Sequence, residues 1–436
     1  MKKISILFFV VFLAAAGGLY PQINRTVYDN GFTLIHSQRK GCGLVSAVLF
    51  VKGGSFDESG DKAGITNLAS NLLQKGTLTR DAAKIALDSE LLGASIGAGS
   101  SSDYTEVSMI VPSENFSPAF AVFCDIVNNP TFPETEFEKE KESIIAAIRS
   151  KNDSIFNTAY DYFNETIYDG NPYHRPSIGY EATVSSLTVA DIIDNYKRNF
   201  RPENMVLSVV GDIGAQEINN AVTAAFGKMK VLGRAADVKK DTAFGEVKRS
   251  SSPVAQLPAK KIFTGKFQQS YYFCGFPAPD VKSGDYPALK MVNEIAGGGM
   301  GGRLFNDLRE KNGLVYEADS FFPSRVSTST FAVYAGTSKE NVDKVEGIIT
   351  AEIAKLPSAT QQELDAAREY LKGTYLIDHR TIQKQAWYLG WWETMGRGFE
   401  YDSGYVGDID GVKLQDIGAA CEKYLTPDKM AAVILK

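Results

Sequence analysis

Residues 187–192 read Leu-Thr-Val-Ala-Asp-Ile and lead to Phe-Arg-Pro-Glu-Asn-Met at 200–205, and the same pattern returns near the end of the chain. The second copy reads Val-Lys-Leu-Gln-Asp-Ile at 412–417, then Leu-Thr-Pro-Asp-Lys-Met at 425–430. The differences 416 − 191, 427 − 202 and 430 − 205 are all 225. Each copy predicts a helix, a proline turn and a buried strand. The chain therefore contains two homologous halves.

Strand and helix patterns predict the fold class of these halves. Alternating apolar runs at 45–51 and 270–276 predict strands, and the patterns at 286–296 and 362–371 predict helices. This mixture predicts an α+β fold in which each half is one sheet with helices packed on one face.

Length and composition predict the domain organisation. A chain of 436 residues is too long for one ordinary core, so two domains are expected. The polar stretch 233–258 predicts a linker between an N-terminal domain at 22–232 and a C-terminal domain at 259–436. Residues 1–18 predict a signal peptide, with a Lys2-Lys3 start, a short apolar core and small residues at the cleavage site. We therefore expect an exported chain, periplasmic or secreted, without stable membrane insertion.

Charge and cysteine usage exclude several classes of function. The net charge is −6, and no run of Lys and Arg is long enough to follow a phosphate backbone, which argues against a nucleic-acid partner. The four cysteines stand singly, with no Cys-x-x-Cys spacing. We expect each to be a small buried apolar residue, and the spacing predicts no disulfide. They are Cys42, Cys124, Cys274 and Cys421.

The strongest motif lies at 297–316, Gly-Gly-Gly-Met-Gly-Gly-Arg-Leu-Phe-Asn-Asp-Leu-Arg-Glu-Lys-Asn-Gly-Leu-Val-Tyr. It resembles the C-terminal half of the pitrilysin/insulinase-like zinc metallopeptidases, and the resemblance covers essentially the whole chain after residue 18. The resemblance implies two related α+β halves folded toward one another as a clamshell. It also implies that Arg309 and Tyr316 hold the substrate peptide in the cleft. The glycines implied to form a substrate-binding loop are Gly297, Gly298, Gly299, Gly301 and Gly302.

The family's zinc motif is replaced in this chain. The family reads His-x-x-Glu-His before Lys-Gly-Thr, and counting back from 75–77 places the two His positions on Asn67 and Asn71 and the general-base Glu on Ser70. The third zinc ligand of the family falls on Ala147. A carboxamide is a poor zinc ligand, and without zinc or a carboxylate base no nucleophilic water is generated.

A histidine count supports this alignment. The chain has only His36, His174 and His379, and no two lie within a helical turn, so a two-His helical zinc motif is excluded. We therefore expect no cofactor in this chain, and the resemblance places zinc in a partner subunit.

Several of these residues also have simpler, structural interpretations. The pattern Gly297-x-Gly299-x-x-Gly302 matches a dinucleotide fingerprint, but a helical pattern precedes it where a strand is required. It is also typical of a helix C-cap and turn without a ligand. We expect His174 to be a structural loop residue and Glu140 a charged surface residue. We expect the aromatic residues of one helix to pack in the core or an interface; these are Trp387, Tyr388, Trp391 and Trp392.

We therefore interpret the chain as the catalytically incomplete subunit of a two-subunit zinc peptidase. The resemblance implies that it binds peptide and supplies Arg309 and Tyr316 to a homologous partner that carries His-x-x-Glu-His. One alternative is a non-enzymatic peptide-binding or scaffold protein of the same fold. A hydrolase with another metal or nucleophile is a second alternative, but the scattered His and Cys residues offer no triad or metal cluster.

Overall fold

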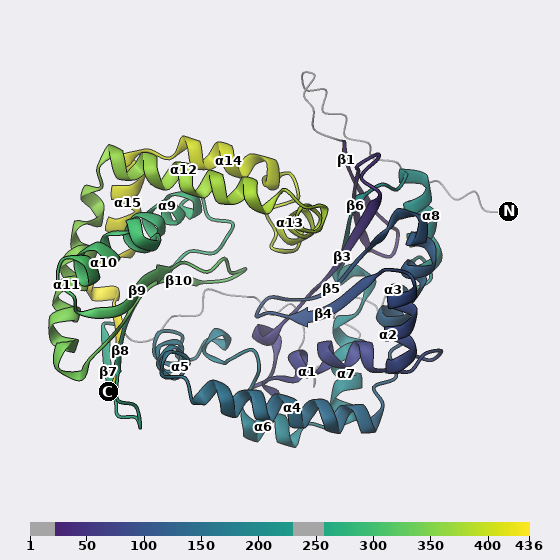
Figure 1. Cartoon of the computed structure of the whole chain (residues 1–436), viewed down its shortest axis with the longest axis horizontal. Helices are drawn as coiled ribbons and strands as arrows, with labels where there is room; N and C mark the ends of the chain where they lie inside the picture. The colour runs from purple at the N-terminus through teal and green to yellow at the C-terminus, as the bar shows by residue number, and fades with distance from the viewer. Residues whose placement is uncertain (1–21, 230–256) are drawn as a thin grey trace.

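The computed structural model describes residues 22–229 and 257–436, which form two lobes (Figure 1). The predicted signal peptide and nearly all of the predicted linker lie outside the described residues. Each helix in the two described ranges is too short or too polar to span a lipid bilayer. The structure confirms the predicted α+β class, with two mixed sheets arranged as a clamshell.

The first lobe contains a six-stranded sheet in the order β1-β2-β6-β3-β5-β4. All neighbours are antiparallel except β2 and β6. Its strands are β1 (Ile23–Val27), β2 (Thr33–Gln38), β3 (Leu44–Lys52), β4 (Ser95–Ser100), β5 (Tyr104–Pro112) and β6 (Met205–Gly211). The helices from this half of the sequence are α1 (Ile65–Leu72), α2 (Ala82–Leu91), α3 (Phe116–Asn128), α4 (Glu134–Asn152), α5 (Ile155–Ile167), α6 (Glu181–Ser186), α7 (Val189–Asn199) and α8 (Ala215–Phe226).

The second lobe contains a five-stranded sheet in the order β7-β11-β8-β10-β9, in which only β7 and β11 are parallel. Its strands are β7 (Ala259–Phe263), β8 (Ser270–Ala278), β9 (Val315–Phe321), β10 (Ser329–Thr337) and β11 (Ala431–Leu435). The helices from this half are α9 (Tyr286–Gly297), α10 (Arg303–Phe305), α11 (Val342–Lys355), α12 (Gln361–Asp378), α13 (Ile382–Thr394), α14 (Tyr401–Gly411) and α15 (Leu414–Tyr424).

Alternation along the strands gives each sheet two apolar faces. On β3, Val45 and Leu49 belong to a core shared with the helices of the first lobe, whereas Val48 and Phe50 face the other way. Because successive side chains of a strand point to opposite faces, a continuous apolar run predicts a sheet covered on both sides. A second layer therefore has to cover the other face of each sheet.

The second layer comes from the opposite half of the chain. Helix α13 packs on β3 and β6 of the first sheet, and helix α5 packs on β8 and β11 of the second. Adding 225 to the bounds of α5 gives 380–392, which overlaps α13, so the exchange is reciprocal between the repeats. In Figure 1, α13 accordingly lies between its own lobe and the first sheet.

Glycine permits the close approach of both exchanged helices. A Cβ added at Gly275 of β8 would lie 2.6 Å from the ring of Phe163 on α5. A Cβ added at Gly390 of α13 would lie 2.7 Å from the ring of Phe50 on β3. Both distances are shorter than van der Waals contact, so these two positions exclude any larger residue without movement of an exchanged helix.

The structure confirms three predicted strands and helices almost to the residue and extends the fourth. The helix expected at 362–371 continues to Asp378. The prediction that all cysteines are buried is wrong for Cys42, which is exposed between two glycines with positive φ, Gly41 and Gly43. The other three are buried, and all four are free thiols.

We predict that Gly275→Ala lowers the free energy of unfolding by about 1–3 kcal/mol, because the new methyl group overpacks the contact with Phe163. Urea unfolding followed by circular dichroism measures this change. Gly347→Ala is the matched control, since nothing lies within 4 Å of its added Cβ and alanine favours its helix. Equal stability of Gly275→Ala and the native chain would contradict the described exchange.

Candidate functional site

The N-terminus of α1 is held by a buried carboxylate. Glu58 accepts hydrogen bonds from the backbone N–H of Gly64 at 2.9 Å and of Thr66 at 2.8 Å. Burial raises the pKa of Glu58 to about 7, while these bonds and the charge of Arg175 act in the opposite direction. Arg175 also donates to the backbone carbonyl of Glu58 at 2.7 Å. This arrangement fixes the helix that carries the replaced zinc motif.

The polar side chains at the replaced motif bond to neighbouring protein groups. Ser70 is buried, and its hydroxyl donates to the carbonyl of Asn67 at 2.8 Å. The amide of Asn71 donates to Glu140 of α4 at 3.0 Å, and the Lys75 ammonium lies 3.5 Å from the other oxygen of the same carboxylate. The expectation that Glu140 is a simple surface residue is therefore wrong, because it is half-buried and bound from both sides.

Zinc does not fit these residues. Ala147 is exposed on α4 and supplies no ligand atom. The Asn71 amide and the Lys75 ammonium both direct N–H donors at the Glu140 carboxylate. Within residues 22–229 and 257–436, no three His, Cys, Asp or Glu side chains lie together as a metal site would require. A catalytic zinc site requires three such ligands and an open position for water.

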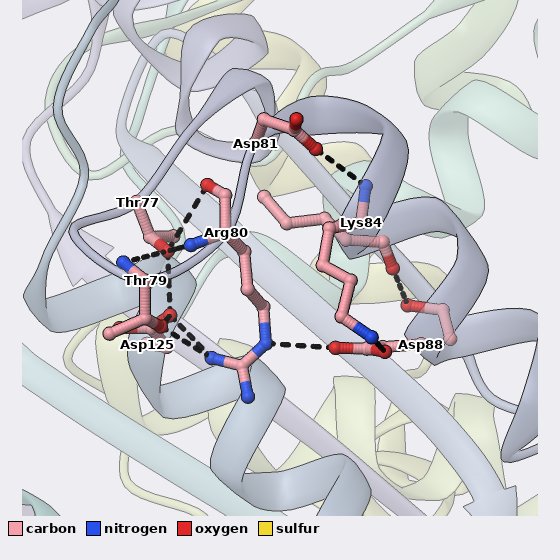
Figure 2. A network of polar contacts seen from close by, with 9 residues as sticks. Thr77, Thr79, Arg80, Asp81, Lys84, Asp88 and Asp125 are labelled. Atoms are coloured by element: carbon pink, nitrogen blue, oxygen red, sulfur yellow. Dashed lines mark hydrogen bonds and ion pairs between the residues drawn. The ribbon is translucent and has the colours of Figure 1, made fainter.

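A polar network fixes the turn that follows Lys75. Figure 2 shows Asp125 of α3 accepting from Thr77 at 2.6 Å, from Thr79 at 2.7 Å and from Arg80 at 2.6 Å. Burial raises the pKa of Asp125, but these hydrogen bonds outweigh burial and lower it. Arg80 also reaches Asp88 of α2 at 3.0 Å. The network positions the Lys-Gly-Thr turn, and with it Lys75, without a metal.

The glycine run of the second lobe ends α9 and packs against β9. Gly298 is the C-cap, and its N–H donates to Glu294 O at 2.8 Å. A Cβ added at Gly297 would lie 2.2 Å from the backbone nitrogen of Ser320, and one added at Gly302 would lie 2.8 Å from the backbone nitrogen of Gly298. Packing therefore accounts for these three glycines without a ligand, and the helix before them contradicts a dinucleotide fingerprint. Gly299 and Gly301 have open space around them.

Two carboxylates lie beneath this loop. Glu294 and Asp319 occupy the space that side chains at Gly298 and Gly297 would fill. Burial raises the pKa of Glu294 to about 7, and the charge of Asp319 adds to the shift. Burial also raises the pKa of Asp319, with a contribution from Glu317. Neither carboxylate was singled out from the sequence, because no spacing along the chain joins α9 to β9.

The structure brings Arg309 and Tyr316 together. The Arg309 guanidinium donates to the backbone carbonyl of Tyr316 at 2.6 Å and lies 5.4 Å from the Phe305 ring centroid. Arg309 belongs to a π-helical turn, Asn306–Glu310, and Tyr316 is the second residue of β9. The Tyr316 side chain is 62% exposed. Both side chains are therefore available at the surface of the second lobe.

Each sheet ends in an edge strand, and the edge strand of the second sheet carries Tyr316. β4 is the last strand of the first sheet, and β9, which carries Tyr316, is the last strand of the second. An edge strand presents unpaired backbone N–H and C=O groups that accept an extended peptide as an additional strand. β4 is partly covered, because the Gln74 side-chain amide in its hydrogen-bonding orientation donates to Ile96 O at 2.9 Å and accepts from the Ala98 N–H at 3.1 Å.

The remaining predicted residues have structural contacts. His174 is part-buried, and its Nδ1 lies 2.7 Å from the carbonyl of Asn171. Trp391 and Trp392 are buried, and Trp387 donates to Glu106 of β5 at 2.8 Å, so this helix packs across the lobes as expected. The Lys-Gly-Thr motif includes Lys75. The motif does not predict that Lys75 pairs with Glu140, because this pairing depends on how α1 packs on α4.

Comparison with known proteins identifies the class. The model described as Insulinase (Peptidase family M16) matches residues 35–180, and the model described as Peptidase M16 inactive domain matches residues 186–371. Together they cover most of both halves, and the chain belongs to the insulinase, or M16 peptidase, family. This confirms the resemblance inferred from the motifs.

Relatives of similar length support this membership. The chain is 25% identical to an uncharacterized zinc protease, YmxG, of Bacillus subtilis over 94% of this chain and 98% of that protein. It is 24% identical to an uncharacterized zinc protease of Rickettsia felis over 94% of this chain and 97% of that protein. Among solved structures, it resembles a protease from Helicobacter pylori, with a TM-score of 0.86 and 21% identity over 96% of this chain and 100% of that chain. It also resembles a peptidase M16 inactive domain from Pseudomonas fluorescens, with a TM-score of 0.84 and 23% identity over 95% of this chain and 98% of that chain.

We predict that the native chain binds no stoichiometric zinc and that one substitution cannot create a site. Asn67→His, Ser70→Glu, Asn71→His and Ala147→Glu together restore three ligands and a base, whereas Asn71→His alone adds one ligand. Metal analysis after dialysis measures bound zinc. The triple variant that retains Ala147 is the matched control. One tightly held zinc in the native chain or in Asn71→His would show that the motif is misplaced.

We predict that Glu294→Gln changes how stability depends on pH. The raised pKa of Glu294 means that its contribution to stability is full below pH ~4.5 and is lost as the pH rises through about 7. Glutamine carries no such loss, so the variant gains stability relative to the native chain between pH 5 and 8. Because the group is half-exposed, we expect a gain of no more than about 1–2 kcal/mol.

Urea unfolding at several pH values measures this gain. Glu310→Gln, an exposed position on the neighbouring turn, is the control. Parallel pH profiles for Glu294→Gln and the native chain would disprove the assignment.

Proposed function

We propose that this chain is the zinc-free subunit of an M16-type peptidase, which binds peptide and contributes Arg309 and Tyr316 to a homologous subunit that carries His-x-x-Glu-His. The observation that carries the proposal is the contrast between the two sites. Donors from Asn71 and Lys75 occupy the Glu140 carboxylate beside the replaced motif, whereas Arg309 and Tyr316 remain exposed at an edge strand. Export to the periplasm or beyond is part of this proposal.

Arg309 and Tyr316 suit this role chemically. Arg309 uses one N–H for the carbonyl of Tyr316, and a guanidinium has five N–H donors, so others remain for a peptide carbonyl. The Tyr316 hydroxyl is a further donor. Zinc in the partner would supply an activated water, and donors aimed at a developing oxyanion would lower the barrier. The two sets of groups need only meet in one chamber.

A second candidate function is peptide binding or scaffolding without catalysis. The glycine loop favours it, because packing and the C-cap explain Gly297, Gly298 and Gly302 without any ligand. The edge strand β9 serves a binding protein equally well.

Mixing this chain with a zinc-bearing homologue separates the two functions. We predict an activity that neither chain has alone, lowered about 10²- to 10³-fold by Arg309→Ala or Tyr316→Phe. Peptide hydrolysis measures the rate, and gel filtration and thermal unfolding check that assembly and stability are unchanged. Lys311→Ala, which removes a neighbouring exposed charge, is the matched control. Full activity in a complex that lacks both Arg309 and Tyr316 side-chain donors would favour the scaffold function.

A further inference from the structure

The β4–β5 hairpin of the first lobe and the β9–β10 hairpin of the second point toward each other in Figure 1, and one tyrosine joins them. Tyr173 lies in a short 3-10 helix, Pro172–His174, after α5. Its hydroxyl donates to Asp103 in the β4–β5 turn at 2.6 Å and accepts from the backbone N–H of Ser327 in the β9–β10 loop at 3.3 Å. One hydroxyl therefore bridges the two lobes.

The ring of Tyr173 is held by both lobes as well. The Phe56 ring centroid from the first lobe lies 4.5 Å away, and the Arg325 guanidinium from the second lobe lies 4.2 Å above the ring. Tyr173 is 3% exposed and Asp103 is 5% exposed. A hydrogen bond between such buried partners is stronger than one in water and requires exact placement of both groups. The junction is thus polar, buried and specific in geometry.

Each side of the junction is fixed to its own lobe. Ser55 and Phe56 donate their N–H groups to Ser101 and Ser102 of the β4–β5 turn at 3.1 and 2.9 Å. In the second lobe, the carbonyl of Arg325 accepts from Val281 at 2.9 Å. A displacement at the junction is therefore transmitted directly to the strands that each hairpin contains.

Those strands include the edge strand of each sheet. β4 and β9 are the outermost strands of their sheets, and each runs directly into the hairpin that Tyr173 contacts. We propose that Tyr173 is a positioning residue that sets the distance and register between the edge strands β4 and β9, so that the peptide seat is preformed rather than closed by the ligand. The inference rests on the proposed function in one respect, the identification of β4 and β9 as the strands that bind the peptide, here called the peptide seat. A preformed seat reduces the ordering cost of binding.

Distance measurements between the lobes test the inference without any ligand. Spin labels at exposed positions, Leu91→Cys on α2 and Leu376→Cys on α12, are placed in a Cys42→Ser background. We expect one narrow distance distribution in this protein and a clearly broadened or shifted one when Tyr173→Phe is added, at unchanged circular dichroism. Tyr196→Phe is the matched control, because the Tyr196 hydroxyl donates to the backbone carbonyl of Val127 at 2.8 Å within the first lobe.

The outcomes separate this inference from the proposed function. If Tyr173→Phe does not fold, Arg325→Met removes the cation above the ring and has to give the same broadening. Superimposable distributions for the native chain and the folded variant overturn the inference. With fluorescein-labelled casein as an unstructured probe, we expect a several-fold weaker affinity for Tyr173→Phe than for Tyr196→Phe. Casein that fails to bind even the native chain contradicts the proposed function, while the distances still decide the role of Tyr173.

Discussion

Each half of this chain gives one helix to the sheet of the other half, and the arrangement of the lobes depends on this exchange. Ala159, Phe163 and Ile167 of α5 are fully buried against the second sheet, and α13 covers the other face of the first. Full burial of a large apolar side chain contributes roughly 1.5–3 kcal/mol, so separation of the lobes would expose several such contributions together. The two lobes therefore share their cores and are not two domains joined only by a linker.

Contacts within the first lobe keep the replaced zinc motif ordered. The cap of α1 by Glu58 and the network around Asp125 hold the backbone of the motif through groups that do not depend on a metal. Zinc ligands can therefore be absent while the helix that would carry them stays in place. At the position of the motif, the negative charge of Glu140 is met by Lys75 instead of a metal. The loss is local to side chains and leaves the fold intact.

The repeat of 225 residues was sufficient to predict two α+β halves, because helix and strand patterns are local properties of the sequence. It did not predict the exchange of α5 and α13, since periodicity shows that a helix has an apolar face but not which sheet will cover it. Gly275 and Gly390 carried the only local signal, a small residue within an apolar run. Among site residues, the contact of Arg309 with Tyr316 agrees with their pairing in the family motif. The binding of Glu140 by Asn71 and Lys75 depends on tertiary approach and was not predicted.

Binding and hydrolysis place different demands on this fold. Hydrolysis needs a metal, a base and a water at α1, and uniform binding of a peptide does not by itself accelerate its cleavage. Binding needs open backbone groups and well-placed donors, and the proposed function assigns these to β9, Arg309 and Tyr316 of the second lobe. Since α1 belongs to the first lobe, the groups at the zinc-motif positions can change without disturbing those of the second lobe. Under the proposed function, this combination lets the chain hold a peptide, and cleavage depends on what a second subunit brings to it.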